Sequence, residues 1–233
     1  MTDRAILFSA PMVAALLAGR KTQTRRSLTL PPAPEHLGEW QVSTVGGAGV
    51  LDGAGRETPE YPCVWHTRNG ATVVPRFAVG DRLWVREAWR THKAYDDLKP
   101  SEMGGDETVW PELDRDNCDA HGRYRHGRFM PRWASRLTLI VTDVRVERLQ
   151  DCSQDDAIAE GIERGGFGTL WGWLAYGEGN PHHQRHFSDP RESYRTLWDS
   201  INGDGAWAAN PWVRAISFDV IKANIDNLPE VAA

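Results

Sequence analysis

The 233-residue sequence has few cysteines and no long apolar run. Its three cysteines, Cys63, Cys118 and Cys152, are odd in number and widely spaced, which argues against a disulfide framework and favours reduced thiols in a cytoplasm. No stretch approaches the roughly 18 apolar residues that a membrane span requires, and residues 1–10 lack the layout of a signal peptide. We therefore expect a cytoplasmic protein that does not enter a membrane.

An excess of positive charge is also missing. The formal net charge is −5, so the chain as a whole does not attract nucleic acid, and any such binding requires a local basic patch. Two segments qualify, 20–26 and 123–136, although each could equally be a solvated face. Their basic residues are Arg20, Lys21, Arg25 and Arg26 in the first, and Arg123, Arg125, Arg128, Arg132 and Arg136 in the second.

The sequence lacks the motifs of several cofactor and metal enzymes. It has no Gly-rich phosphate loop, serine elbow, dinucleotide fingerprint or zinc-deaminase Pro-Cys-x-x-Cys pair. Two groups offer metal-ligand residue types at short spacing: Cys118, His121 and His126, and His182, His183 and His186. Neither group supplies four well-spaced ligands, so we predict no metal and no cofactor.

Local signals predict three helices, at residues 9–18, 153–161 and 189–203. In the first, Ser9 can cap the N-terminus and Gly19 supplies the stop. The second begins with a capping box formed by Ser153 and Asp156. The third carries one apolar stripe at helical spacing: Tyr194, Leu197, Trp198 and Ile201.

Strands are predicted at 82–89, 137–149 and 210–220. In the second, the apolar phase changes between Val141 and Val144, which predicts a bulge or a barrel corner. In the third, Arg214 interrupts an alternation of Trp212, Ile216, Phe218 and Val220. Polar or Pro/Gly-rich stretches at about 29–79, 93–130 and 163–188 predict long surface insertions. We therefore expect one α+β domain, residues 1–233, made of a small β-rich core, two or three helices and long loops.

The segment 19–26, GRKTQTRR, is the richest in chemistry. It holds four cations and two hydroxyls directly after a helix stop. Clustered positive charge favours the neutral form of a lysine such as Lys21, and a neutral lysine can take the proton of a threonine hydroxyl and make it a nucleophile. The alternative is a basic turn that touches only solvent or phosphate.

Four blocks of the sequence resemble the ASCH family, which is related to the PUA domains: residues 16–26 (LLAGRKTQTRR), 79–86 (VGDRLWVR), 137–161 and 210–220. The resemblance implies a small PUA-like β-barrel with flanking helices. The family includes small bacterial amidohydrolases that remove the acetyl group from N4-acetylcytidine with a lysine, a threonine and a glutamate. In this sequence the matching positions are Lys21, Thr24 and Glu160. Those enzymes are about half this length, so the insertions could admit a different and larger substrate.

Other features of the sequence bear on the same site. Glu160 ends its helix, where the helix dipole disfavours a carboxylate, and this suits proton transfer; the alternative is an exposed surface glutamate. Four residues of the strand 82–89 could recognise the edge and the ring face of a base: Trp84, Arg86, Glu87 and Trp89. The alternative for the two tryptophans is simple core packing.

These observations predict one of two functions. The first is a hydrolase that cleaves an amide on an acylated pyrimidine nucleoside: Thr24 attacks, Lys21 activates it, and Glu160 shuttles protons. The second is a non-catalytic protein of bacterial or phage origin that binds single-stranded nucleic acid or a modified base, with Arg25, Arg26 and the 123–136 arginines on phosphates. A docking role of the loops for a protein partner is a third possibility. The sequence does not indicate an oligomeric state.

Overall fold

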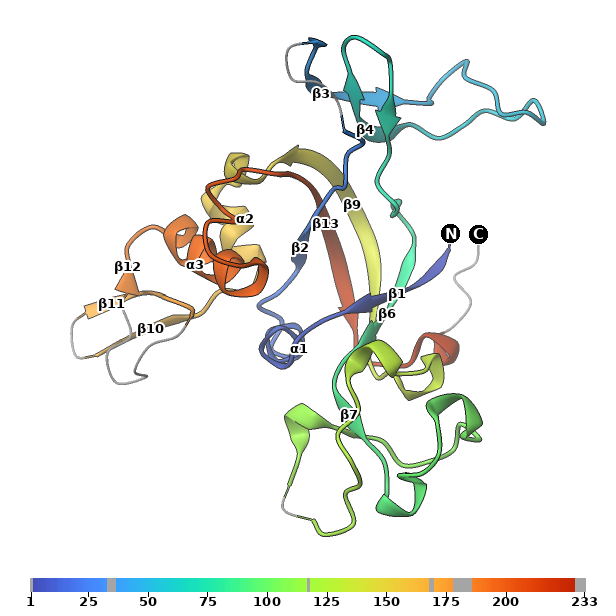
Figure 1. Ribbon diagram of the computed structural model, residues 1–233, viewed down its shortest axis with the longest axis vertical. Helices are drawn as coiled ribbons and strands as arrows, with labels where there is room; N and C mark the ends of the chain where they lie inside the picture. The colour runs from blue at the N-terminus through green and yellow to red at the C-terminus, as the bar shows by residue number, and fades with distance from the viewer. Residues whose placement is uncertain (1, 33–36, 117, 168–169, 178–185, 229–233) are drawn as a thin grey trace. The chain divides into compact units, whose positions relative to one another are not determined.

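The computed structural model describes residues 2–32, 37–116, 118–167, 170–177 and 186–228 (Figure 1). Within these ranges the chain forms three α-helices and four separate β-sheets, which confirms the α+β class. The largest sheet has the strand order β1-β6-β9-β13-β2. The sheets of these ranges include no closed barrel, so the PUA-like barrel stays a proposal.

The chain folds into two compact units, each assembled from separated segments. Unit 1 comprises Met1–Thr22, Gly80–Val141 and Phe218–Ala233, and unit 2 comprises Gln23–Val79 and Thr142–Ser217. Strands β9 and β13 pass from one unit into the other along the chain. The single-domain organisation stays a prediction.

Unit 1 is built on β1 (Asp3–Leu7), which runs parallel to β6 (Arg82–Arg86). Strand β6 pairs antiparallel with the first residues of β9 (Thr138–Arg148). The strand predicted at 82–89 ends earlier, at Arg86. Trp89 belongs to a separate strand, β7 (Trp89–Arg90), which pairs with β8 (Trp110–Pro111). The 93–130 insertion is mostly short 3-10 turns: η2 (Lys93–Tyr95), η3 (Pro100–Glu102), η4 (Glu112–Asp114) and η5 (Gly127–Phe129). Two more follow in this unit, η6 (Arg132–Ala134) and η9 (Ile225–Asn227).

The first predicted helix is confirmed as α1 (Ala10–Leu17). Ser9 occupies the N-cap position, but its side chain makes no capping hydrogen bond, so that part of the prediction was wrong. Gly19 adopts φ +70°, a left-handed conformation that glycine reaches without strain. The chain then turns so that the backbone N–H groups of Arg20 and Lys21 both donate to the carbonyl of Ala15, which fixes the start of the basic segment.

Unit 2 contains β2 (Gln23–Ser27), antiparallel to β13 (Trp212–Ile221), with Thr24 opposite Ile216. Its helices are α2 (Gln154–Ala159) and α3 (Pro190–Asn202), which pack on each other (Figure 1), and the turn η7 (Leu149–Asp151) precedes α2. The capping box of Ser153 and Asp156 is confirmed. The stripe of α3 is buried only as far as Trp198, because Ile201 is 58% exposed.

Two insertions of unit 2 are not the simple loops predicted. The first contains a sheet of β3 (Trp40–Val45), β4 (Tyr61–His66) and β5 (Thr72–Val73). The second contains β10 (Arg164–Phe167), β11 (Leu170–Leu174) and β12 (His186–Phe187). Burial of apolar side chains holds the first sheet in place, because Val64 on β4 packs into one core cluster with Leu28, Val146 and Trp212.

The change of apolar phase within β9 is confirmed. Val141 and Val144 are buried, whereas Thr142 and Asp143 between them are both exposed. Before this exposed pair the buried apolar residues have odd numbers, Leu139 and Val141, and after it they have even numbers, Val144 and Val146. The shift falls at the boundary between the units, which lies between Val141 and Thr142.

In the part of the chain that the structure describes, we find no helix with the length and apolarity needed to cross a membrane.

Candidate functional site

Lys21 is a buried lysine in unit 1. It is 2% exposed, which is rare for this residue type, and its Nζ lies 5.8 Å from the centroid of the Phe8 ring. This burial does not fit the alternative of a basic turn whose lysine touches only solvent. Thr24 and Glu160 belong to unit 2, so the convergence of Lys21 with them stays a prediction.

Within unit 2, the end of α2 meets strand β2. Glu160 is the C-cap residue of α2 and is only 3% exposed, so the alternative of an exposed surface glutamate was wrong. Arg25 on β2 donates from Nη1 to Glu160 Oε1 at 3.4 Å across 135 residues of sequence. Thr24, the next residue on β2, is 4% exposed. The two chain segments that carry Thr24 and Glu160 are therefore in contact.

Arg25 is the centre of this contact, and its side chain is fully buried. Its Nε and Nη2 donate to Glu147 Oε1 at 3.0 and 2.7 Å, and Nη2 lies 3.2 Å from Asp156 Oδ2. Its Nη1 also donates to Gln23 Oε1 at 2.6 Å. These bonds occupy all three guanidinium nitrogens. They favour an internal electrostatic role for Arg25 over the predicted substrate or phosphate contact.

The protonation states around Arg25 follow from burial and charge. Burial opposes its positive charge, but nearby acidic groups, Glu160 and Glu147 among them, outweigh burial and raise the pKa of Arg25. Burial likewise raises the pKa of the Cys152 thiol to about 12, so this cysteine is protonated near neutral pH and is a poor nucleophile.

Tyr194 on α3 is a second neighbour of Glu160. Burial and the charge of Glu160 raise the pKa of Tyr194 well above its usual value, and the two residues share a hydrogen bond. A tyrosine that keeps its proton donates to a carboxylate. Glu160 thus accepts from Arg25 and from Tyr194, and these two donors fix its orientation.

Strand alternation places Thr24 and Arg26 on the face of β2 opposite to that of Gln23 and Arg25. The carboxylate of Glu160 nevertheless interacts with both Arg25, through a hydrogen bond, and Arg26, through its charge. Burial lowers the pKa of Arg26, and the charge of Glu160 opposes that shift. Because β2 is the last strand in its sheet, a carboxylate beside its edge can reach side chains from both faces. The charge of Glu160 therefore acts on one side chain from each face of β2.

Asp156 provides a test of this network through pH. Burial alone would raise the pKa of Asp156, but hydrogen bonds from Arg145 and Ser153 and the charge of Arg25 hold it well below its usual range. A lowered pKa means that the stabilisation is fully present above the ordinary Asp value of about 4 and is lost as pH falls below it.

We expect the free energy of unfolding to fall below pH 4, and to fall less steeply in Asp156→Asn. Urea unfolding at several pH values measures this. The exposed Asp143→Asn is the control and should keep the wild-type slope; an unchanged slope in Asp156→Asn would refute the assignment.

In unit 1, the residues predicted to recognise a base have internal partners. Arg86 stacks on Trp84, with its Cζ 4.5 Å from the ring centroid. Glu87 is 2% exposed and accepts two hydrogen bonds from Arg136, at 2.8 and 3.0 Å. Trp89 is 0% exposed and lies in a core cluster. This burial favours packing for Trp89 and ion pairing for Glu87 over the predicted substrate contacts.

The arginine run 123–136 also has structural partners. Arg125 is buried and donates to the carbonyls of Leu98 and Tyr95 at 3.0 and 2.7 Å. Arg132 Nη2 forms an ion pair with Asp3 Oδ2 at 2.7 Å, and Arg136 Nε forms one with Glu87 Oε1 at 2.8 Å. At least three of the five guanidinium groups therefore hold the fold together, which favours the structural alternative over a phosphate-binding patch.

A cluster of three arginines in unit 2 was not predicted. Arg214 pairs in register with Arg26, and its pKa is lowered by burial and by the positive charges of Arg26 and Arg76. The Cζ of Arg214 lies 5.4 Å from the Phe77 ring centroid, and its buried Nε makes no hydrogen bond. The signal in the sequence was Arg214 itself, the cation that interrupts an apolar strand. Of the predicted histidine group, His182 and His183 lie outside the described residues.

Comparison with known proteins identifies no relative of this chain. No family model matches it, and no match is found among curated proteins or among solved structures.

Proposed function

We propose that this protein is a hydrolase that cleaves the amide of an acylated pyrimidine nucleoside, such as N4-acetylcytidine, on a PUA-like fold of the ASCH type. The observation that carries the proposal is the buried contact between Arg25 and Glu160, 3.4 Å long, which joins the end of α2 to the strand that holds Thr24. The resemblance assigned Lys21, Thr24 and Glu160 from sequence alone. Each of the three is at most 4% exposed, and lysine and glutamate are almost never buried without a specific role or partner.

The proposed reaction has two steps. In the first, Thr24 Oγ attacks the acyl carbonyl carbon while neutral Lys21 accepts the hydroxyl proton. The carbon–nitrogen bond then breaks, and Glu160 passes the proton held by Lys21 to the departing exocyclic amine, which leaves Lys21 neutral again. In the second step, water hydrolyses the acyl-threonine ester and regenerates the hydroxyl of Thr24. The sum is amide plus water giving amine plus carboxylic acid.

The surroundings of Glu160 support its proposed role. Two cations, Arg25 and Arg26, and the hydroxyl of Tyr194 act on this one carboxylate. A carboxylate held by fixed donors keeps one orientation toward the reacting groups, which lowers the cost of reaching the transition state.

A panel of modified nucleosides tests the proposal. The purified protein is incubated with N4-acetylcytidine, with its longer N4-acyl analogues and with an N-acylated purine nucleoside, and the products are identified by mass spectrometry. We expect release of the free amine from the pyrimidine amides. Unchanged substrate throughout the panel would overturn the proposal.

The burial of Lys21 calls for a substitution that keeps its volume. Lys21→Met retains the apolar stem but removes the amine, so we expect activity to be lost and the free energy of unfolding to change little. Lys21→Ala also removes the packed stem, and we expect it to cost about 2 kcal/mol or more. Urea unfolding and the deacylation rate measure both effects. Lys222→Met, at an exposed lysine of the same unit, is the control; activity retained in Lys21→Met would show that the amine is not the base.

The arginine cluster favours a second candidate, a non-catalytic reader of nucleic acid or of a modified base. The positive charges of Arg26 and Arg76 both repel Arg214, and an anion such as a phosphate group would relieve that repulsion. Binding of single-stranded RNA that weakens steeply with salt and with Arg214→Gln, in a protein that converts none of the panel, would select this function.

A further inference from the structure

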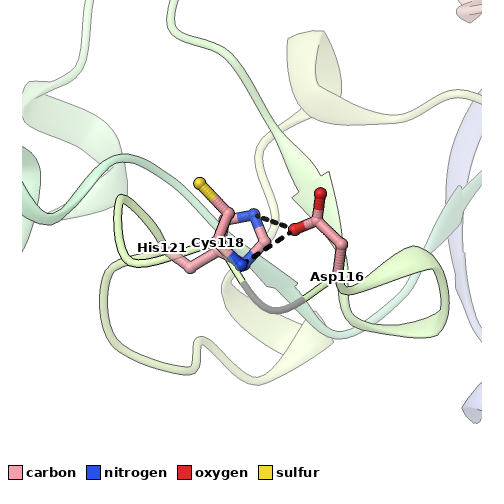
Figure 2. Close-up of side chains that lie close together, drawn as sticks. All are labelled: Asp116, Cys118 and His121. Carbon is pink, nitrogen blue, oxygen red and sulfur yellow. Dashed lines mark hydrogen bonds and ion pairs between the residues drawn. The ribbon is translucent and has the colours of Figure 1, made fainter.

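Three side chains of the 93–130 insertion in unit 1 come together around one point. The carboxylate of Asp116, the thiol of Cys118 and the imidazole of His121 each offer a metal-ligand atom, and these atoms all lie within 4.8 Å of one another (Figure 2). From this cluster we propose that Asp116, Cys118 and His121 bind a divalent transition-metal ion of the zinc class. The site is separate from Lys21, Thr24 and Glu160, and does not depend on the proposed hydrolase function.

The imidazole of His121 is the independent observation that points to a ligand. Its side chain is 4% exposed, yet neither ring nitrogen makes a hydrogen bond. Nε2 approaches Asp116 Oδ1 at 3.3 Å, a distance that qualifies as an ion pair but without hydrogen-bond geometry. A buried polar group without a hydrogen bond is costly, by about 1–3 kcal/mol. A metal ion bound to one nitrogen removes the cost at that nitrogen.

The position of His121 is well defined by its packing. Its ring centroid lies 4.8 Å from that of Trp110 on β8, and its backbone forms a bridge with His92. Its backbone N–H donates to the carbonyl of Cys118 at 3.2 Å, and the N–H of Cys118 donates to Asp116 Oδ1 at 3.3 Å. His121 is thus a fixed ligand, and the other two are held close to it.

The distances suit a zinc-class ion after a small adjustment. Zinc bonds of about 2.0–2.3 Å at a tetrahedral angle place neighbouring ligand atoms about 3.5 Å apart. The ligand atoms, now within 4.8 Å, need to move inward by about 1 Å. Asp116 and Cys118 are exposed and can make that movement. Three protein ligands leave a fourth position for water.

The ligand set also selects the class of metal. A thiolate and an imidazole favour Zn²⁺ or Co²⁺ over Mg²⁺ and Ca²⁺, which prefer oxygen ligands. On binding, the thiol of Cys118 loses its proton to solvent, so affinity rises with pH. The sequence had grouped Cys118 and His121 with His126, but His126 Nδ1 accepts from the N–H of Arg128 at 3.0 Å and caps η5.

Cobalt titration of the full chain tests the site. The protein is stripped with a chelator and titrated with Co²⁺, and the visible and near-ultraviolet spectrum is recorded. We expect one equivalent to bind, with the charge-transfer absorption of a cobalt–thiolate bond, and Zn²⁺ to displace it and raise the Tm. Absence of the charge-transfer band would overturn the proposal.

Variants separate this site from other thiols and histidines. Cys118→Ser and Asp116→Asn change exposed residues and should leave the fold intact while weakening Co²⁺ binding at least tenfold. His121→Asn should do the same, and circular dichroism checks its fold. The matched control is His126→Asn, which should bind as the wild type does. Equal affinity in Cys118→Ser and in the wild type would contradict the assignment.

Discussion

Replacing Glu160 with glutamine is expected to lower kcat for deacylation by about 10²- to 10⁴-fold, the range that general acid–base groups contribute. Glutamine has nearly the same shape and can still accept the hydrogen bond from Arg25, but it cannot transfer a proton. The fold should survive, because Arg25 keeps Glu147 and Asp156 as partners. Initial rates over a range of substrate concentration separate kcat from KM, and KM should change little.

The control for this variant is Glu192→Gln. Glu192 is a half-exposed carboxylate on α3 that pairs with Arg195 at 2.9 Å, so it belongs to the same unit and carries the same charge. The deacylation activity of Glu192→Gln should equal that of the wild type. A Glu160→Gln enzyme whose kcat stays within about twofold of the wild-type value would remove Glu160 from the mechanism.

Replacing Arg25 with methionine should cause the largest loss of stability, about 3–5 kcal/mol, because it leaves three nearby carboxylates without their shared cation. Two of them, Glu147 and Asp156, are only 15% and 13% exposed, and Glu160 is more buried still. Protonating these carboxylates relieves their repulsion, so the loss should shrink as pH is lowered. Urea unfolding at neutral and acid pH measures both effects.

The comparison for Arg25→Met is Arg195→Met. Arg195 is 38% exposed and pairs with Glu192, and a surface pair of this kind contributes about 0–1 kcal/mol. A loss below about 1 kcal/mol for Arg25→Met would mean that Arg25 is not the centre of the cluster. A loss that does not shrink at low pH would assign its effect to packing and not to charge.

Local chemistry made the helices predictable. The capping box of Ser153 and Asp156 lies within four residues of sequence, so the start of α2 could be predicted from the sequence. Gly19 marked the end of α1 for the same reason. The strands inside the insertions were not predicted, because their sequences lack a strong alternation of apolar and polar residues. They are stabilised by packing on the rest of unit 2, as Val64 shows.

The candidate site was only partly predictable. The resemblance supplied Lys21, Thr24 and Glu160, but the partner of Glu160 is Arg25, 135 residues away, and nothing in the sequence connects the two. Arg25 was expected to touch phosphate because it belongs to a short segment with four cations, which suggests an exposed basic patch. Its burial depends on carboxylates from β9 and α2, which only the fold brings to it.

The cluster in the 93–130 insertion shows the same limit at short range. Spacing along the chain grouped His126 with Cys118 and His121, whereas the fold brings Asp116 to them instead. Ligand types can be recognised in a sequence, but the direction of each side chain depends on the turns between them.

Product analysis with N4-acetylcytidine tests the proposed function most directly. Wild-type protein and Thr24→Val, which keeps the shape of threonine but removes its hydroxyl, are incubated with the substrate, and cytidine and acetate are quantified together. The proposed mechanism predicts equal amounts of both products from the wild type and none above background from Thr24→Val. Unchanged substrate with the wild type, or hydrolysis by Thr24→Val at the wild-type rate, would contradict it.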